Sequence, residues 1–198
     1  MHIIFNPLDQ HLFKISLNSI PYSLDEIVDD LKNETWEYQS VDNGLFDIEY
    51  CYPDTVKSHK LQEIQNFFFD PEFKTHWISQ LAHNEIFKMR RPGLDLSWLQ
   101  ENTYVGFNWG RTPPNQTKAS LHNDDINILS FGLIYLVKLD TPNQSTYFVK
   151  FNGNEEIRVP TGFGCGWVVV NTEKSDHRAF NNTNEHRYHM RFSIRPRF

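Results

Sequence analysis

The chain has 198 residues, the length of one large domain, which leaves no room for a second independent enzyme module. Its 5 Trp, 8 Tyr and 16 Phe can supply a sizeable buried core. The formal net charge is −6, so no overall field attracts phosphate backbones or anionic lipids. We therefore expect binding to neither nucleic acid nor a membrane.

The sequence also predicts the cellular location of the protein. No apolar run approaches the roughly 20 residues of a membrane helix, and the first residues lack the pattern of a secretion signal. Cys51 and Cys165 are the only cysteines and lie in no paired motif. Neither a disulfide framework nor a cysteine-based zinc site is expected, and we predict a soluble, cytoplasmic protein.

The first hundred residues mix strand and helix patterns. Alternating apolar and polar residues predict three short strands, over residues 2–5, 13–17 and 46–52. Ser23 and Glu26 form a capping box, in which each side chain satisfies a free backbone donor of the other residue. This motif predicts a helix near residues 24–32.

Two longer helices are expected next. The first runs from about Thr55 to Phe69, and the second begins after Asp70, because a capping Asp there precedes a proline at the first helical position. The second helix should extend to roughly Lys88. Five apolar residues along it recur near helical spacing and predict a face packed on a sheet. They are Phe73, Trp77, Ile78, Leu81 and Phe87.

Beyond residue 100 the helical periodicity disappears, and short apolar runs alternate with turn sequences. The predicted strands are 103–109, 131–139, 146–151, 156–160, 165–170, 177–180 and 187–195. This spacing is typical of an antiparallel sandwich or barrel. The simplest architecture is mostly β with a helical cover (α+β).

A short polar motif offers metal ligands. His122 and Asp124 are two residues apart, so in an extended segment both side chains project to one face. His177, near the start of a later strand, is the third candidate, and the three would form the two-histidine, one-carboxylate set that binds iron(II) and leaves positions open. Asp125 remains an alternative to Asp124 as the carboxylate ligand. Taken alone, the motif is also explained by a polar turn.

The last predicted strand has two different faces. Arg187, His189, Arg191, Ser193 and Arg195 alternate with the apolar residues between them. An arginine beside a hydroxyl on one face is suited to bind a carboxylate, because the guanidinium binds it through two donors and the serine adds a third. The alternative is an exposed edge strand with solvated arginines.

Together these residues resemble a known family. His122-x-Asp124, Leu133-Ile-Tyr-Leu136, Ser145-Thr-Tyr-Phe148, Pro160 with Gly162, Trp167-Val-Val-Val170, His177 and Arg191-x-Ser193 are similar to the iron(II)- and 2-oxoglutarate-dependent oxygenases, specifically the prolyl-4-hydroxylase-like branch. The similarity spans about residues 102–195. It implies a double-stranded β-helix, a jelly-roll of eight antiparallel strands with helices against one sheet. In a single domain, 1–198, residues 101–198 would be this catalytic core and residues 1–100 a mixed α/β support.

The resemblance also implies roles for individual residues. His122, Asp124 and His177 would bind iron(II), and Arg191, assisted by Ser193, would hold the distal carboxylate of 2-oxoglutarate, with Arg187 as the alternative. Tyr104 and Tyr135 lie where such enzymes often place a hydrogen bond to this co-substrate. The implied reaction is hydroxylation of a substrate by dioxygen, with decarboxylation of 2-oxoglutarate to succinate.

The substrate itself is not encoded in a readable motif, and a small molecule or a peptide fits the small, acidic chain. Residues 109–116 are a candidate rim of the site, although a proline-rich connection explains them equally well. Two other classes remain open. One is a cupin-type metal enzyme without 2-oxoglutarate, for which His186 or His189 could be a third histidine ligand. The other is a non-catalytic jelly-roll binding module.

Overall fold

A computed structural model describes residues 1–8, 11–41, 46–116, 127–138, 147–151, 155–159, 162–172, 175–179 and 181–197. The helices are α1 (Leu24–Lys32), α2 (His59–Phe69), α3 (Pro71–His83), α4 (Glu85–Arg90) and α5 (Leu96–Asn102). The strands are β1 (His2–Pro7), β2 (Leu12–Asn18), β3 (Glu37–Val41), β4 (Phe46–Cys51), β5 (Thr103–Thr112), β6 (Ser130–Leu136), β7 (Tyr147–Phe151), β8 (Glu155–Val159), β9 (Cys165–Val170), β10 (Ser175–Ala179) and β11 (Arg187–Pro196). No helix within these ranges is both long and apolar enough to cross a membrane.

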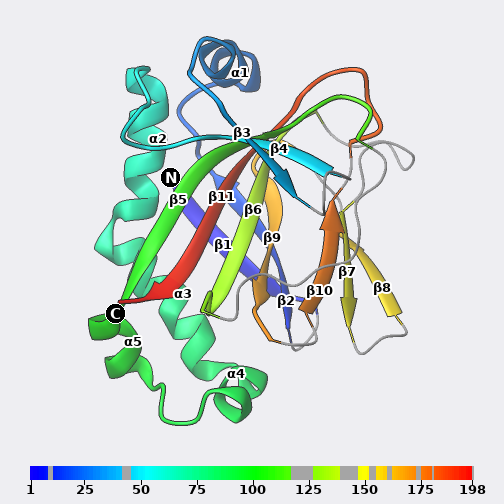
Figure 1. The fold of residues 1–198 in the computed structure, drawn as a ribbon. Coiled ribbons are helices and arrows are strands. Elements are labelled where there is room, and N and C mark those ends of the chain that lie inside the picture. Colours follow the sequence, from blue (N-terminus) through cyan, green and yellow to red (C-terminus); the bar gives the residue numbers. More distant parts are fainter. Residues whose placement is uncertain are drawn as a thin grey trace.

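The strands form two antiparallel sheets. A large sheet has the order β1-β2-β9-β6-β11-β5-β4-β3, and a small one has the order β10-β7-β8. The helices lie against one face of the large sheet, and the small sheet stands beyond its other face (Figure 1). The predicted architecture, mostly β with a helical cover, is confirmed, and four strands from the first hundred residues extend the large sheet at its two edges.

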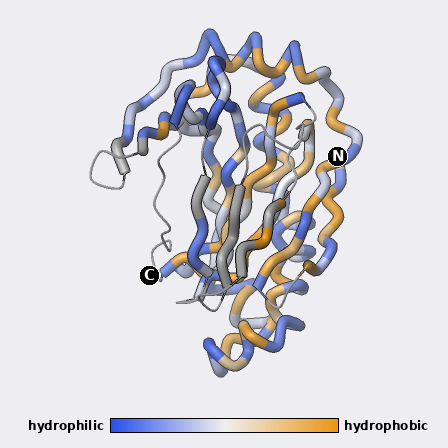
Figure 2. Tube along the Cα trace, turned by 90° about the vertical axis from the view of Figure 1, so that its right-hand side faces the viewer, coloured by the Kyte–Doolittle hydropathy of each residue, from blue (hydrophilic) through white to orange (hydrophobic). Residues whose placement is uncertain are grey.

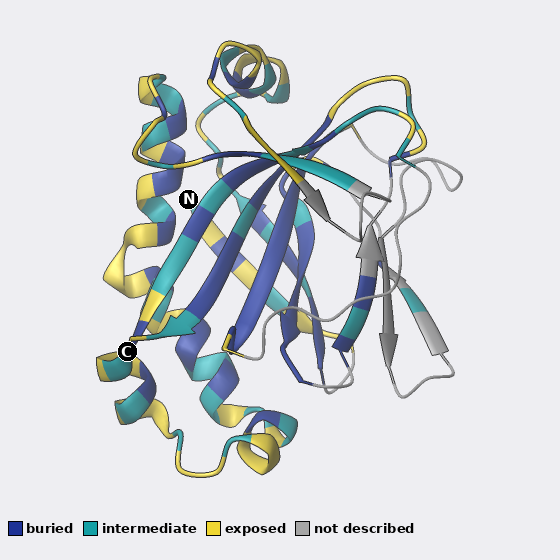
Figure 3. Ribbon diagram, viewed as in Figure 1, coloured by how far each residue is buried: buried dark blue, intermediate teal, exposed yellow. Residues whose placement is uncertain are grey.

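The two faces of the large sheet differ as the alternation of β11 predicts. Four apolar side chains of β11 are buried in the core shared with the helices: Tyr188, Met190, Phe192 and Ile194. The central strands of the sheet are almost wholly buried (Figure 3). Hydrophobic positions recur along these strands and along the helices (Figure 2). The opposite face, called the inner face below, is the one that the small sheet covers.

Capping residues set the helix boundaries. The capping box of α1 is present, since the Ser23 hydroxyl accepts from the Glu26 N–H and the Glu26 carboxylate accepts from the Ser23 N–H. Asp70 caps α3 in front of Pro71, as predicted. The predicted apolar face is confirmed for its four residues on α3, and Phe87, which lies on α4, is buried in the same helix-side core.

Two predicted helix boundaries were wrong, and two elements were not predicted. α2 begins at His59 and not near Thr55, because the buried Glu34 carboxylate accepts hydrogen bonds from the Lys57 and Ser58 N–H groups and holds the chain before Ser58 in a non-helical conformation. The helix expected to reach Lys88 stops at His83, where Asn84 adopts an extended conformation and caps α4. The short α5 and the edge strand β3 were not predicted.

Candidate functional site

His177 lies in the middle of β10 and points into the space between the two sheets. Its side chain is 2 % exposed, and its ring lies 4.8 Å from the ring of Phe131 and 5.8 Å from that of Trp167, both on the inner face. Its Nδ1 is 3.2 Å from the Ser175 carbonyl oxygen, and since a carbonyl can only accept, Nδ1 carries the proton. In a neutral ring this leaves the lone pair on Nε2, the form of histidine that binds metals.

His122 and Asp124 lie outside the described residues, but the residues that flank this segment are described. Before it, the Gln116 carbonyl accepts from the N–H of Asn181, just beyond the end of β10. After it, the Ile128 carbonyl accepts from the side-chain amide of Asn171, which directly follows β9 and whose oxygen accepts from the Ser175 hydroxyl at the start of β10. Residues 117–126 therefore connect two points that lie close to the two ends of the strand that carries His177. Among the described residues alone, no three histidine, cysteine or acidic side chains are grouped to hold a metal.

A row of contacts leads from His177 to a buried arginine. The Trp167 indole N–H donates to the Tyr135 hydroxyl at 3.2 Å. The Arg187 guanidinium carbon lies 4.2 Å from the centre of the Tyr135 ring, and Arg187 is only 3 % exposed. His177, Trp167, Tyr135 and Arg187 are together called the inner-face cluster. The Trp167 N–H thus fixes the position of the Tyr135 hydroxyl, and the Tyr135 ring packs against the Arg187 guanidinium.

Arg191 and Ser193 lie on the same inner face, as the alternation predicts. Arg191 is partly exposed, and its guanidinium carbon is 5.9 Å from the Tyr50 ring centre and 6.0 Å from that of Phe131. Ser193 is buried, and its hydroxyl oxygen accepts from the Arg195 Nε–H at 3.0 Å. The structure thus brings Arg187 together with Tyr135, and Ser193 together with Arg195.

His189 lies between the two arginines and stays neutral. Burial, with added repulsion from Arg187 and Arg191, lowers the pKa of its imidazole to about 3. Its Nε2 is directed at the backbone of Gly110 on β5, where any β-carbon would clash with the ring. His186 is largely exposed, 3.6 Å from the Glu49 carboxylate. Neither histidine is placed as the third histidine ligand that a cupin-type site would need.

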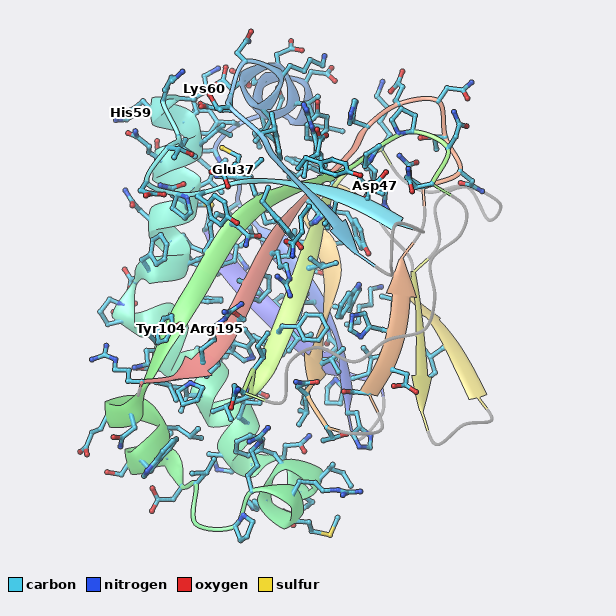
Figure 4. The ribbon with its side chains drawn as sticks, viewed as in Figure 1. Glu37, Asp47, His59, Lys60, Tyr104 and Arg195 are labelled. Atoms are coloured by element: carbon cyan, nitrogen blue, oxygen red, sulfur yellow. The ribbon has the colours of Figure 1, made fainter. Side chains whose placement is uncertain are left out.

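Other candidates lie apart from the inner-face cluster. Tyr104 pairs with Arg195 at the far end of β5 and is 42 % exposed (Figure 4). Tyr135 pairs with His189, six residues from Arg195 along β11, so the two tyrosines are separated by roughly 20 Å along the strand direction. They cannot contact one small co-substrate together.

Two residues of the candidate rim, 109–116, lie away from the inner face. Trp109 is fully buried on the helix side, where its indole N–H donates to Gln65. Arg111 donates to Glu49 at 2.6 Å and stacks on Trp36. The alternation of β5 turns both side chains away from the inner face, so neither is part of a rim.

Sequence reasoning did not assign a role to Trp167 or to Phe131. Both were seen only as strand residues, because an indole or a phenyl ring in an apolar run has no feature that separates a site wall from a core. Their place beside His177 depends on how β10 packs over β6 and β9.

No protein-family model matches the sequence, and no curated protein matches it. Solved structures do match. A prolyl hydroxylase from Trichoplax adhaerens, in complex with a peptide fragment of the hypoxia inducible factor oxygen degradation domain, has a TM-score of 0.65 at 11 % identity, over 94 % of this chain and 84 % of that one.

Two further structures give the same result. A dioxygenase for auxin oxidation from rice has a TM-score of 0.59 at 12 % identity, over 94 % of this chain and 74 % of that one. A putative oxygenase from Shewanella oneidensis has a TM-score of 0.58 at 12 % identity, over 94 % and 82 %. The resemblance predicted from the sequence is therefore confirmed for the fold, which is that of prolyl hydroxylases and related oxygenases.

Proposed function

We propose that the protein is an iron(II)- and 2-oxoglutarate-dependent dioxygenase that hydroxylates a small molecule or a peptide. The observation that carries the proposal is the inner-face cluster, in which a buried imidazole and a buried guanidinium are joined by Trp167 and Tyr135. A metal ligand and an anion-binding group that face one space are what a chelating dicarboxylate requires. The fold shared with oxygenases supports the same conclusion.

The metal would be held by His122, Asp124 and His177. The tautomer of His177 fits this role, since the Ser175 carbonyl fixes the proton on Nδ1. The hydrogen bonds of Gln116 and Ile128 support the other two ligands, because they tie both ends of the segment that contains them to the flanks of β10. Iron(II) bound there would supply the reduction of dioxygen that accompanies decarboxylation of 2-oxoglutarate to succinate.

The protein's own residues would orient the co-substrate and exclude water. The Arg187 guanidinium would bind the distal carboxylate of 2-oxoglutarate, and the Tyr135 hydroxyl would donate to the same group. A fixed positive charge in a buried position needs no reorganisation when the dianion arrives. Phe131 and Trp167 would pack against the His177 ring and shield it from water.

Arg191 with Ser193 was the anchor expected from the sequence, and Arg187 was the alternative. Burial and the contact with Tyr135 favour Arg187, whereas Arg191 is partly exposed and Ser193 already accepts from Arg195. The expected role of Arg191 stays a prediction that binding measurements on the two variants can test.

Metal binding is the first test. The protein is dialysed anaerobically against iron(II), and bound iron is counted for the wild type and for His122→Ala, Asp124→Ala and His177→Ala. His186→Ala is the matched control, because His186 lies at the Glu49 carboxylate, away from the inner face. One iron per chain that is lost in the three variants and kept in the control is the expected result.

Two alternatives predict different results, the first in this experiment and the second in a titration with 2-oxoglutarate. A non-catalytic jelly-roll module would bind no iron in any sample. A cupin-type enzyme would bind iron but would show no dependence on 2-oxoglutarate, and a change of Arg187 would leave its ligand binding unaltered. The positions of His186 and His189 speak against this second alternative.

A further inference from the structure

The strand that carries His177 has no ladder of hydrogen bonds to the large sheet. Among the described strands, β10 pairs only with β7, in the small sheet. The proposed site nevertheless combines His177 with Tyr135 and Arg187, which lie on the large sheet. A metal site needs its side chains held within about 0.5 Å of the productive geometry. Other contacts must therefore set the position of β10 over the large sheet.

Asn171 provides such a contact before the start of β10. Its side-chain N–H donates to the Ile128 carbonyl at 2.8 Å, and its backbone N–H donates to the Leu129 carbonyl at 3.0 Å. Leu129 directly precedes β6, and its own N–H donates to the Ile194 carbonyl on β11. Asn171 is thus tied to the large sheet at the beginning of β6.

The same side chain of Asn171 is joined to β10 through Ser175. The Ser175 hydroxyl accepts from the Thr172 N–H at 3.0 Å, and its proton is shared between the Thr172 carbonyl at 2.7 Å and the Asn171 side-chain oxygen at 3.1 Å. The Ser175 carbonyl accepts from Nδ1 of His177. A continuous path of hydrogen bonds therefore runs from Asn171 to the imidazole.

Asn181 makes the corresponding contact beyond the other end of β10. Its side-chain amide donates to the Thr112 and Pro113 carbonyls, at the end of β5, at 3.1 and 3.0 Å. The amide also donates to the Glu185 carbonyl at 2.7 Å, and its oxygen accepts from the N–H and the hydroxyl of Thr183. The loop that leads from β10 to β11 is thereby held beside the end of β5 (Figure 1).

The two asparagines thus fasten β10 to β6 and to β5, which are the two neighbours of β11 in the large sheet. An amide carries donors and an acceptor in one side chain, so it can join two segments of the chain at once. Asn171 is 2 % exposed and Asn181 is fully buried, so water does not compete for these hydrogen bonds.

We propose that Asn171 and Asn181 are positioning residues, which hold His177 at a fixed place relative to the other metal ligands and to Arg187. The inference rests on the proposed function. Loss of either amide would leave all the proposed ligands in the chain but would let β10 shift. Because partners that orient a metal ligand set its affinity, we expect about tenfold weaker metal binding.

The test uses cobalt(II) as the probe. It is titrated anaerobically into the wild type, Asn171→Ala and Asn181→Ala, and its visible d–d bands report both the affinity and the coordination geometry. Gln65→Ala is the matched control, because Gln65 is also a buried amide that joins two segments, by donating to the Pro53 carbonyl and accepting from Trp109 on the helix side. Denaturant unfolding of every sample measures stability, and the milder changes Asn171→Ser and Asn181→Ser replace any alanine variant that does not fold.

The three alanine variants should all be less stable than the wild type. Cobalt(II) should bind about tenfold more weakly, with shifted bands, in the two asparagine variants only, whereas Gln65→Ala should keep the wild-type bands and affinity. The inference alone is overturned if the asparagine variants bind cobalt(II) as the wild type does, or if Gln65→Ala loses as much affinity as they do. A wild type that binds no cobalt(II) would overturn the proposed function as well.

Discussion

The imidazole of His189 lies directly against the backbone of Gly110 on the neighbouring strand, at a point where any side chain would clash with it. Glycine at this position leaves room for the imidazole, which stands between Arg187 and Arg191 along β11. Gly110→Ala should therefore move the ring and lower the free energy of unfolding by about 1–3 kcal/mol. Denaturant unfolding measures the change.

A double-mutant cycle tests whether the His189 ring causes the cost of Gly110→Ala. In His189→Ala the clash is absent, so a further Gly110→Ala change should cost less than half of what it costs in the wild type. Equal costs in the two backgrounds would show that the ring does not set the requirement for glycine.

The neutral state of His189 makes stability depend on pH. Its pKa is about 3 in the folded protein, well below the ordinary value of 6.5, so between these values the unfolded chain binds a proton that the folded one does not. Stability should thus fall as the pH drops below about 6.5, by about 1.4 kcal/mol for each pH unit. Unfolding curves between pH 7 and pH 4 check the slope.

His189→Gln should lower the pH dependence of the unfolding free energy by the contribution of one proton, about 1.4 kcal/mol per pH unit, because glutamine does not titrate. The control is His59→Gln on the exposed first turn of α2, and it should keep the wild-type slope. A slope that is the same in wild type and His189→Gln would mean that other groups carry the pH dependence.

Tyr135 should contribute to co-substrate affinity, and Tyr104 should not. Tyr135→Phe removes a hydroxyl that accepts from Trp167 and that we propose donates to the co-substrate carboxylate bound by Arg187. We expect about tenfold weaker binding of 2-oxoglutarate, the value of one hydrogen bond to a charged group. Calorimetric titration of the metal-loaded variants measures it, and Tyr104→Phe should bind within twofold of wild type. A larger loss in Tyr104→Phe than in Tyr135→Phe would contradict the assignment.

Glu34 should be a stabilising residue far from the site. Its buried carboxylate accepts from the Lys57 and Ser58 N–H groups at the beginning of α2. Glu34→Ala leaves those donors without this partner and should lower the free energy of unfolding by about 1–3 kcal/mol. Glu101→Ala, at an exposed position of α5, is the control and should change it by less than 0.5 kcal/mol. Equal effects of the two changes would refute the role of Glu34.

Local chemistry explains which parts of the fold were predictable. The alternation of β11 and the caps of α1 and α3 depend only on neighbouring residues, so the sequence alone shows them. The break at Asn84 was missed because asparagine is tolerated inside a helix and is also an effective cap, and tertiary packing decides between these.

The candidate site could be predicted only as far as local alternation reaches. Alternation places Arg187 and Arg191 on one face, but only strand register shows that Arg187 meets Tyr135 and that Arg191 stands between Tyr50 and Phe131. In the same way, no sequence pattern shows that His189 packs on Gly110, because that contact joins residues far apart in the chain.

The measurement that tests the central claim most directly is an anaerobic titration of 2-oxoglutarate into the iron(II)-loaded protein, followed by the visible metal-to-ligand charge-transfer band. It needs no substrate. The account predicts a band in the wild type that is absent in His177→Ala and that needs at least tenfold more 2-oxoglutarate in Arg187→Met. An iron-loaded wild type that develops no band at any concentration of 2-oxoglutarate would contradict it.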